Sequence, residues 1–251
     1  MPPARHAVIA ASRIGGGLGL GVPKCLVPVA GRPAIDYLLA ALADVPHVRL
    51  IVGFRETDVM AHVRMLRPDV LFVRDPAFLR TTTLETLRLG VRGLDEPFML
   101  LDGDAIYGRD SLARFRAACT DGKPMLGIST ELGANPLFVG VRSTQAGLSV
   151  TSLSRTEPSH YAWAETAQLT PALLTSGVGS GGAPVPLFEQ LASRLPMRAA
   201  LLDRMRIESV DDLRQAEQSL AALTRPRQGT LIPFPKRRPP PRTRLRRARE
   251  G

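Results

Sequence analysis

The stretch Ala7–Pro33, AVIAASRIGGGLGLGVPKCLVPVAGRP, decides how the rest of the chain is organised. It begins with a short apolar run over residues 7–11, which predicts a first β-strand. A loop with glycines at 15, 16, 17, 19 and 21 follows and leads to Lys24. Because glycine lets backbone N–H groups approach an anion and lysine adds a positive charge, this arrangement predicts a phosphate-binding loop.

Outside this stretch, apolar runs alternate with amphipathic segments. This alternation predicts an α/β fold of Rossmann-like type, with a mostly parallel central sheet flanked by helices. Strands are expected at 7–11, 48–52, 70–73 and 98–101, and helices at 34–43, 57–65, 82–91 and 111–118. The threonines near the start of the third helix are of the kind that caps free N–H groups.

From Pro124 onward the pattern changes. Short strand-like runs at 126–129, 137–141 and 148–153 predict a small antiparallel extension of the fold. A helix at 186–195, a strand at 199–202 and a last helix at 210–223 are expected to follow, whereas 161–169 fits either a helix or a strand.

The net charge of +10 is concentrated at one end of the chain. Residues 226–251 contain nine arginines and lysines against one glutamate, so this segment carries +8 and the other 225 residues carry only +2. We therefore expect a folded domain at 1–225 and a disordered basic tail at 226–251. Such a tail also predicts weak, salt-dependent contact with nucleic acid or an anionic surface.

The composition gives a first indication of the cellular compartment. No apolar run approaches the ~20 residues that a transmembrane helix requires. The two cysteines, Cys25 and Cys119, lack metal-ligand spacing and are expected to be isolated thiols. Both observations favour a cytoplasmic protein.

Several polar features are expected to meet at one edge of the predicted sheet. Ligands of open parallel sheets bind beyond the carboxyl ends of the strands. In this chain those ends carry the glycine-rich loop, residues 53–55, residues 75–83 and the triplet Asp102-Gly103-Asp104.

The spacing of these features distinguishes between kinds of phosphate chemistry. A Walker A loop requires Ser or Thr after its lysine, but Lys24 is followed by Cys25. The glycine spacing does not match a dinucleotide fingerprint, and no acid follows the second strand. A carboxylate opposite a phosphate loop fits Mg²⁺-assisted nucleotidyl transfer, in which an acceptor phosphate attacks an NTP and pyrophosphate leaves.

Three segments resemble the nucleotidyltransferases with a GT-A-like fold. They are VIAAS…GVPKCLVPVAGRPAIDYLLAAL near the start, LLDGDAIY at 100–107 and MRIESVDDLRQAEQSL at 205–220. Together they extend the resemblance over about residues 6 to 223. The compact size and the segment RTTTLETLRLGV at 80–91 resemble the phosphocholine and inositol-phosphate cytidylyltransferase branch more than the hexose-1-phosphate enzymes.

This resemblance implies roles for individual residues. It makes Lys24 the catalytic, phosphate-contacting lysine and Asp104 a magnesium ligand, with Glu208 as a second ligand. It also implies that the substrates are an NTP, with CTP favoured, and a phosphorylated small molecule such as phosphocholine, an inositol phosphate or a sugar 1-phosphate. Together with Lys24, the nucleotide-binding residues would be Ala10, Ala11, Ser12, Gly15, Gly16, Gly17, Thr82, Thr83 and Asp102.

The loop departs from the usual pattern of that family. Ser12 stands where a glycine is common, and the usual arginine after the second glycine is absent, while Arg13 precedes Gly15. Arg13 is then the residue expected to stabilise the leaving pyrophosphate. The same departures leave open an alternative, a catalytically degenerate module that binds a nucleotide or a partner. We interpret Glu165 and Trp163 as structural, with contact to the acceptor as the alternative role.

Overall fold

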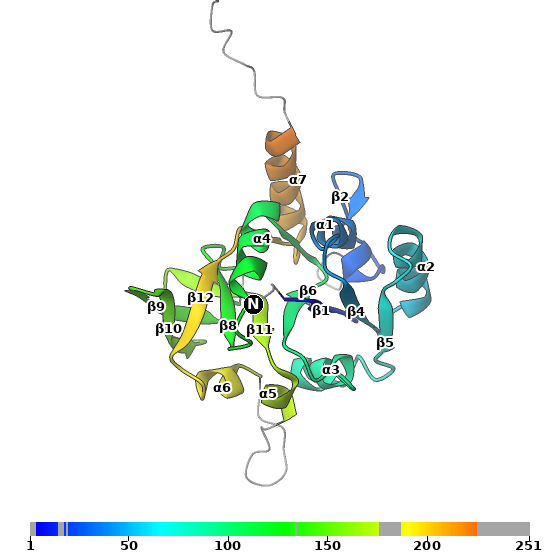
Figure 1. Cartoon of the computed structure of the whole chain (residues 1–251). Helices are drawn as coiled ribbons and strands as arrows, with labels where there is room; N and C mark the ends of the chain where they lie inside the picture. The colour runs from blue at the N-terminus through cyan, green and yellow to red at the C-terminus, as the bar shows by residue number, and fades with distance from the viewer. Residues whose placement is uncertain (1–3, 15–17, 19, 134, 176–186, 225–251) are drawn as a thin grey trace, which may run out of the picture.

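The computed structural model describes residues 4–14, 18, 20–133, 135–175 and 187–224 (Figure 1). Its centre is a nine-stranded sheet with the strand order β5-β4-β1-β6-β11-β8-β12-β10-β9. The strands of this sheet are β1 (His6–Ala11), β4 (His47–Val52), β5 (Leu71–Arg74), β6 (Phe98–Asp102), β8 (Met125–Ser129), β9 (Phe138–Thr144), β10 (Gly147–Ser154), β11 (Tyr161–Leu169) and β12 (Met197–Leu201). The helices are α1 (Ala34–Ala41), α2 (Glu56–Leu66), α3 (Thr83–Gly90), α4 (Arg109–Ala118), α5 (Pro171–Thr175), α6 (Leu187–Ala192) and α7 (Val210–Thr224).

Most strands of the sheet run in one direction. β5, β4, β1 and β6 are parallel to one another, and β8 is parallel to β12. β11 is antiparallel to β6 and β8, and β10 is antiparallel to β12 and β9. Only β10 and β11 therefore point the opposite way, which confirms the predicted α/β class with a mostly parallel sheet. The antiparallel strands continue this sheet and do not form a separate layer.

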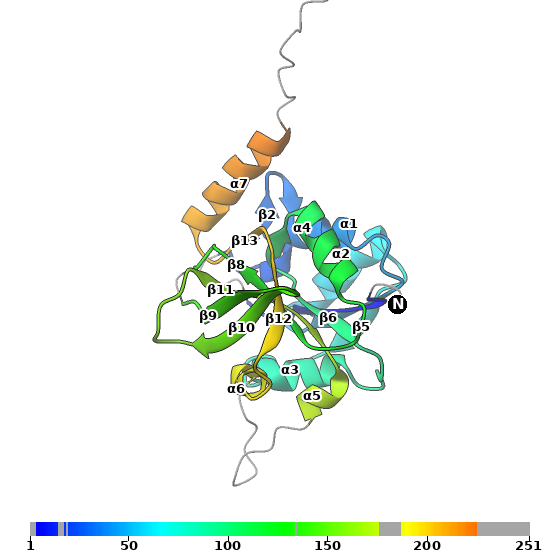
Figure 2. The same ribbon diagram turned by 60° about the vertical axis from the view of Figure 1, so that its left-hand side comes forward.

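Helices cover both faces of the sheet. In Figures 1 and 2, α1, α2, α4 and α7 lie on one side, and α3, α5 and α6 lie on the other. The alternation of side chains along each strand explains this arrangement. Ile9 and Leu101 belong to the apolar cluster under α1, whereas Val8 and Leu100 belong to the cluster over α3. Both faces of the central strands are thus buried, which is why these strands are nearly continuous apolar runs.

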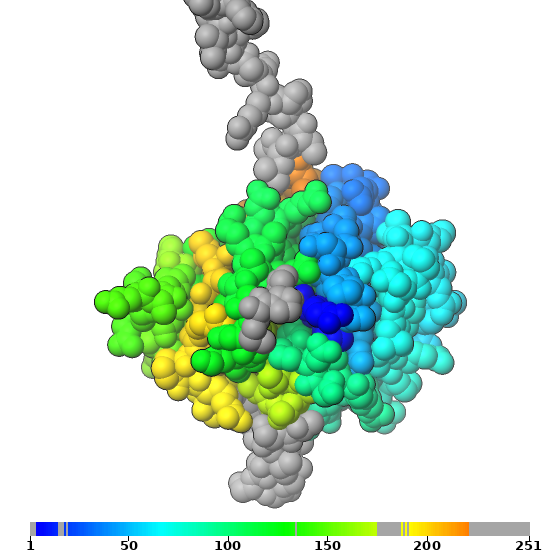
Figure 3. Space-filling view, viewed as in Figure 1, coloured from blue at the N-terminus to red at the C-terminus, as the bar shows by residue number. Residues whose placement is uncertain are grey.

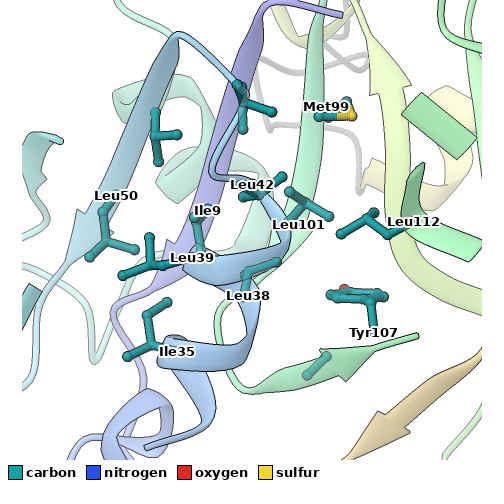
Figure 4. Close-up of a cluster of buried hydrophobic side chains, with 14 of the residues drawn as sticks. Ile9, Ile35, Leu38, Leu39, Leu42, Leu50, Met99, Leu101, Tyr107 and Leu112 are labelled. Carbon is teal, nitrogen blue, oxygen red and sulfur yellow. The ribbon is translucent and has the colours of Figure 1, made fainter. Parts of the chain in front are cut away.

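The cluster under α1 is drawn in Figure 4. Ile35, Leu38 and Leu39 point from α1 toward Ile9 and Leu101 on the sheet. Each of these five side chains is at most 5% exposed. Burial of each aliphatic side chain contributes about 1.5–3 kcal/mol of free energy. This contact therefore fixes α1 and the loop before it against the sheet.

Two small pairs of strands attach distant segments to the central sheet. β7 (Ala105–Tyr107) pairs with β13 (Arg204–Arg206), and β2 (Pro28–Val29) pairs with β3 (Arg32–Pro33). A third apolar cluster with Val27, Ile106, Ile207 and Ala216 lies between them. The segment that precedes α7 is therefore held beside the turn that follows β6.

The described elements agree with most of the predicted ones, and the exceptions are short elements or a segment that was left open. Residues 161–169, which fitted either element, form strand β11 in the middle of the sheet. β7, β13, α5 and the β2–β3 pair were not predicted, because they are two to five residues long and leave little periodicity. The helix predicted at 186–195 is the shorter α6.

The parallel strands and the later strands form one body. In the space-filling view, the blue-to-cyan residues and the green-to-yellow residues lie against each other (Figure 3). None of the helices in the described part of the chain has the length and hydrophobicity required to span a membrane. The basic tail and its predicted contacts lie outside the described residues.

Candidate active site

A pocket of about 600 Å³ lies where β1 and β6 end. Its walls come from the start of the glycine-rich loop, the turn after β6, the first turns of α3, strand β11 and the segment 204–208. Among its lining residues are Ala10, Ala11, Ser12, Arg13, Lys24, Thr83, Asp102, Asp104, Trp163, Glu165, Arg204, Arg206 and Glu208. The structure therefore brings together most of the predicted site residues that it describes.

The turn Asp102-Gly103-Asp104 is packed directly on the end of β1. The Gly103 N–H donates to the carbonyl oxygen of Ala10 at 2.9 Å. A Cβ atom at Gly103 would lie 2.9 Å from that same oxygen and 2.9 Å from the Cβ of Ala11. Only glycine allows the backbone to approach so closely, and this contact fixes where Asp104 enters the pocket.

Lys24 lies between two acidic side chains. It begins the short helix η2 (Lys24–Leu26), and its backbone N–H donates to Arg13 across the loop. Its ammonium group forms a close ion pair with Asp104 and lies 3.9 Å from Oε1 of Glu208. The Asp104 side chain is only 6% exposed and that of Lys24 18%, so water screens this pair little.

Burial and the neighbouring carboxylates govern the ionisation of this group. Burial and the nearby Asp102 raise the pKa of Asp104 to about 8, although Lys24 acts in the opposite direction. Burial also raises the pKa of Asp102. For Lys24, burial acts to lower the pKa, but Asp104 and Asp102 outweigh it and the pKa is raised. Two buried carboxylates thus share one ammonium group, and an additional cation would stabilise their charged forms.

The donor set suits a hard divalent cation. The described residues contain no group of three or more His, Cys, Asp or Glu side chains that could hold a metal ion without other ligands. Mg²⁺ does not require one, because it binds one or two carboxylates and takes its remaining ligands from phosphates and water. Asp104 and Glu208 approach the same ammonium group from two segments, so a cation at that position would meet both carboxylates.

The pattern of residues before α7 explains why three charged side chains face the pocket. Arg204, Arg206 and Glu208 alternate with Met205 and Ile207, and the latter two pack into the third apolar cluster. Sequence reasoning missed both arginines. The period-two alternation of charged and apolar residues was the signal that could have found them.

Glu165 joins the two arginines. Its Oε2 atom lies 3.3 Å from Nη1 of Arg204, and its Oε1 atom lies 3.1 Å from Nη2 of Arg206. Nη2 of Arg206 also lies 2.7 Å from Oε1 of Glu208. Trp163 lines the pocket nearby, and its indole N–H donates to the carbonyl of Thr166 at 3.0 Å.

The predicted nucleotide-binding residues fall into three groups. Residues 10–13 and Thr83 line the pocket, and Nη2 of Arg13 donates to the Thr83 hydroxyl at 3.3 Å. Thr82 caps α3 through a reciprocal hydrogen-bond pair with Glu85 and is not among the lining residues. Gly15, Gly16 and Gly17 lie outside the described residues.

Other segments at this edge support the pocket from behind. The Phe54 N–H donates to the carbonyl of Ser12 at 3.0 Å, so residues 53–55 brace the loop and do not line the pocket. Asp75 is fully buried and accepts hydrogen bonds from the hydroxyls of Thr81 and Thr86. Of the four segments expected at this edge, the glycine-rich loop, the segment 75–83 through Thr83 alone and the turn after β6 contribute lining residues.

Known proteins with similar sequence or structure were compared with this chain. CMP-5'-(3-aminopropyl)phosphonate synthase from Streptomyces rubellomurinus is 34% identical over 120 residues. That match covers 45% of this chain and only 19% of the synthase.

Three solved structures share the fold at low sequence identity. The inositol-1-phosphate CTP transferase from T. maritima has a TM-score of 0.68 at 16% identity, over 87% of this chain and 97% of that one. The CTP:phosphocholine cytidylyltransferase from Streptococcus pneumoniae gives 0.69 at 17%, over 86% and 99%. UDP-glucose pyrophosphorylase in complex with UDP-glucose gives 0.70 at 14%, over 88% and 99%.

The family assignment rests on a direct sequence match. The MobA-like NTP transferase domain matches residues 10–175 of this chain, which is more than half of its length. The matched segment contains the loop, Lys24 and the turn with Asp104, and the structural similarities agree with it. The chain therefore belongs to the family of MobA-like NTP transferase domains.

Proposed function

We propose that this chain transfers a nucleotidyl group from CTP to a small molecule that carries a phosphate or phosphonate group, in an Mg²⁺-dependent reaction. The observation that carries the proposal is the position of Lys24 between Asp104 and Glu208 in a pocket that also holds two arginines. The name of the Streptomyces relative supports a cytidine nucleotide and a phosphonate acceptor.

The proposed reaction is an in-line displacement at the α-phosphorus of the nucleotide. An oxygen of the acceptor phosphate or phosphonate forms a bond to this phosphorus, and the bond to the bridging oxygen of pyrophosphate breaks. The acceptor oxygen is already ionised near neutral pH, so no general base is required. What the chain must supply is orientation and neutralisation of negative charge.

The residues of the pocket fit these tasks. Lys24 would contact the triphosphate from the loop, and Arg13, held at Thr83, would neutralise charge on the departing pyrophosphate. Asp104 and Glu208 would hold Mg²⁺, which, when bound, neutralises phosphate charge and polarises the phosphoryl group. Fully ionised, Asp102, Asp104, Glu165 and Glu208 carry −4 against +5 on Arg13, Lys24, Arg155, Arg204 and Arg206, so the lining charges nearly cancel and Mg²⁺ would add positive charge for a polyphosphate.

A nucleotide panel tests this proposal. Thermal melting of the full chain is measured with CTP, UTP, GTP, ATP or dTTP, with and without Mg²⁺. In separate samples, pyrophosphate release is measured with phosphocholine and 3-aminopropylphosphonate as acceptors. We expect the largest rise in Tm with CTP and Mg²⁺, and pyrophosphate release that EDTA abolishes. CTP binding without pyrophosphate release in the presence of either acceptor would favour the degenerate, binding-only module that the altered Ser12-Arg13 loop suggests.

A further inference from the structure

Glu165, Arg204 and Arg206 form a connected charged group in the pocket. One glutamate contacts both arginines, at 3.3 Å and 3.1 Å, and each contact uses a different carboxylate oxygen. The three residues come from two segments, β11 and β13, that lie far apart in the sequence. The group carries a net charge of +1, and all three side chains line the pocket.

The two arginines retain hydrogen-bonding capacity that the described residues do not use. The Arg204 side chain is 2% exposed and that of Arg206 is 23% exposed. The Nε atoms of both are buried and have no hydrogen-bond partner among the described residues. Among the described residues, the ion pairs of Arg206 with Glu165 and Glu208 both use Nη2, which leaves the N–H groups on Nη1 to contact a ligand. A buried guanidinium with unpaired N–H groups is costly unless a ligand completes its hydrogen bonds.

The backbone of β11 is distorted at the glutamate. Glu165 has a φ of 55°, in the left-handed region that non-glycine residues rarely adopt. It lies in an irregularity of the pairing with β8, between Trp163 and Ala167. Bulges of this kind redirect a side chain and are common beside functional sites. Here the distortion accompanies a side chain that lines the pocket and holds both arginines.

We propose that Arg206 binds the anionic phosphate or phosphonate group of the acceptor, and that Glu165 and Arg204 are positioning residues for it. This inference rests on the proposed nucleotidyl transfer and adds the place where the second substrate binds. A planar guanidinium with free N–H groups matches the oxygens of a phosphate or phosphonate. Arg206 also contacts Glu208, so the acceptor anion would be held beside the residues proposed to hold Mg²⁺.

Arg206 differs in its surroundings from an arginine in an ordinary surface ion pair. Arg214 is a useful contrast, because it is 69% exposed and its one ion pair among the described residues is with Asp211 on the surface of α7. A surface pair of that kind contributes little to stability or binding. Arg206 instead lies in the pocket and connects two acidic residues from different segments.

A binding experiment that does not depend on turnover tests the inference. The full chain is titrated with 3-aminopropylphosphonate and, separately, with phosphocholine, and binding is followed by ³¹P NMR. We expect Arg206→Gln to weaken binding by at least about tenfold, the size expected for a lost hydrogen bond to a charged group. Arg206→Lys should recover part of the affinity, and Glu165→Gln should weaken binding less than Arg206→Gln.

The controls separate a binding role from a structural one. Arg214→Gln is the matched control and should bind both probes like the wild type, and thermal melting should show that every variant is folded. CTP binding, measured in parallel, should change less than twofold in Arg206→Gln. Two probes, one a phosphonate and one a phosphate monoester, show which of these groups the subsite prefers.

Three outcomes would overturn the inference. They are unchanged binding of both probes in Arg206→Gln, an equal loss of CTP and probe affinity in that variant, and the absence of probe binding to the wild-type chain. Failure of the wild type to bind any NTP would instead contradict the proposed function, while a loss of probe binding in Arg206→Gln would still support the anion subsite.

Discussion

The two sides of the pocket are built in different ways. On the side proposed to bind the nucleotide, β1, its loop and the turn after β6 place Lys24 and Asp104 at the carboxyl ends of parallel strands. On the side proposed to bind the acceptor, a bulged antiparallel strand and the three-residue strand β13 place Glu165, Arg204 and Arg206. The first side uses contiguous motifs, and the second joins segments that are distant in the sequence. One pocket can therefore combine a half that sequence motifs predict with a half that has no motif.

The largest effect is expected on the nucleotide side, at Asp104. Asp104→Asn keeps the size of the side chain but removes a charge from the proposed metal site. We expect kcat/KM to fall by at least about a hundredfold, as for other groups that stabilise transition-state charge. Steady-state pyrophosphate release measures the loss, and circular dichroism checks that the fold is retained. A variant with wild-type turnover would remove Asp104 from the mechanism.

Lys24 should follow as the next most sensitive position. Lys24→Met keeps much of the aliphatic chain but removes the ammonium group between Asp104 and Glu208. We expect at least about a tenfold loss of kcat/KM, because one of several positive charges near the phosphates is lost. If the two sides of the pocket bind different substrates, the affinity for the acceptor probes in the ³¹P titration should fall less in this variant than in Arg206→Gln.

Gly103 tests whether close packing holds the turn on β1. Gly103→Ala places a Cβ atom 2.9 Å from backbone and side-chain atoms of Ala10 and Ala11, which cannot move without distorting β1. We expect the free energy of unfolding to fall by about 2 kcal/mol, within the range for overpacked sites. Urea denaturation measures this change. Gly93→Ala is not a matched control for Gly103→Ala, because the φ of Gly93 is positive, at 67°.

The adjacent residues Thr82 and Thr83 give the smallest expected effects. Thr82 caps α3, so Thr82→Ala should lower the free energy of unfolding by about 1 kcal/mol. Thr83 lines the pocket and accepts from Arg13, so Thr83→Val should raise the KM for CTP by about threefold, the effect of about one weak hydrogen bond. Denaturation measures the capping role of Thr82, and initial rates measure the pocket role of Thr83. A loss of stability in Thr83→Val with a raised KM in Thr82→Ala would contradict both assignments.

The sequence was sufficient for the parallel part of the fold because its signals are local. Apolar runs such as 98–101 and the loop before Lys24 can be recognised without knowledge of their partners. The family resemblance then placed Asp104 and Glu208, and the structure brings both to Lys24.

The sequence was insufficient where structure depends on long-range pairing. β13 is three residues long and is defined by its pairing with β7, almost a hundred residues earlier in the chain, since Arg204 pairs with Tyr107. The left-handed backbone of Glu165 has no local signal, because glutamate rarely adopts it. Arg204 is buried and pairs with Glu165 from a distant segment, so neither residue points to the site when considered alone.

The most direct test of the account is to identify the products. The full chain is incubated with CTP, Mg²⁺ and either phosphocholine or 3-aminopropylphosphonate, and the mixture is followed by ³¹P NMR and mass spectrometry. We expect pyrophosphate and a CMP-linked acceptor to form in equal amounts, and neither to form with Asp104→Asn. Intact CTP with both acceptors, or release of orthophosphate in place of pyrophosphate, would contradict the account.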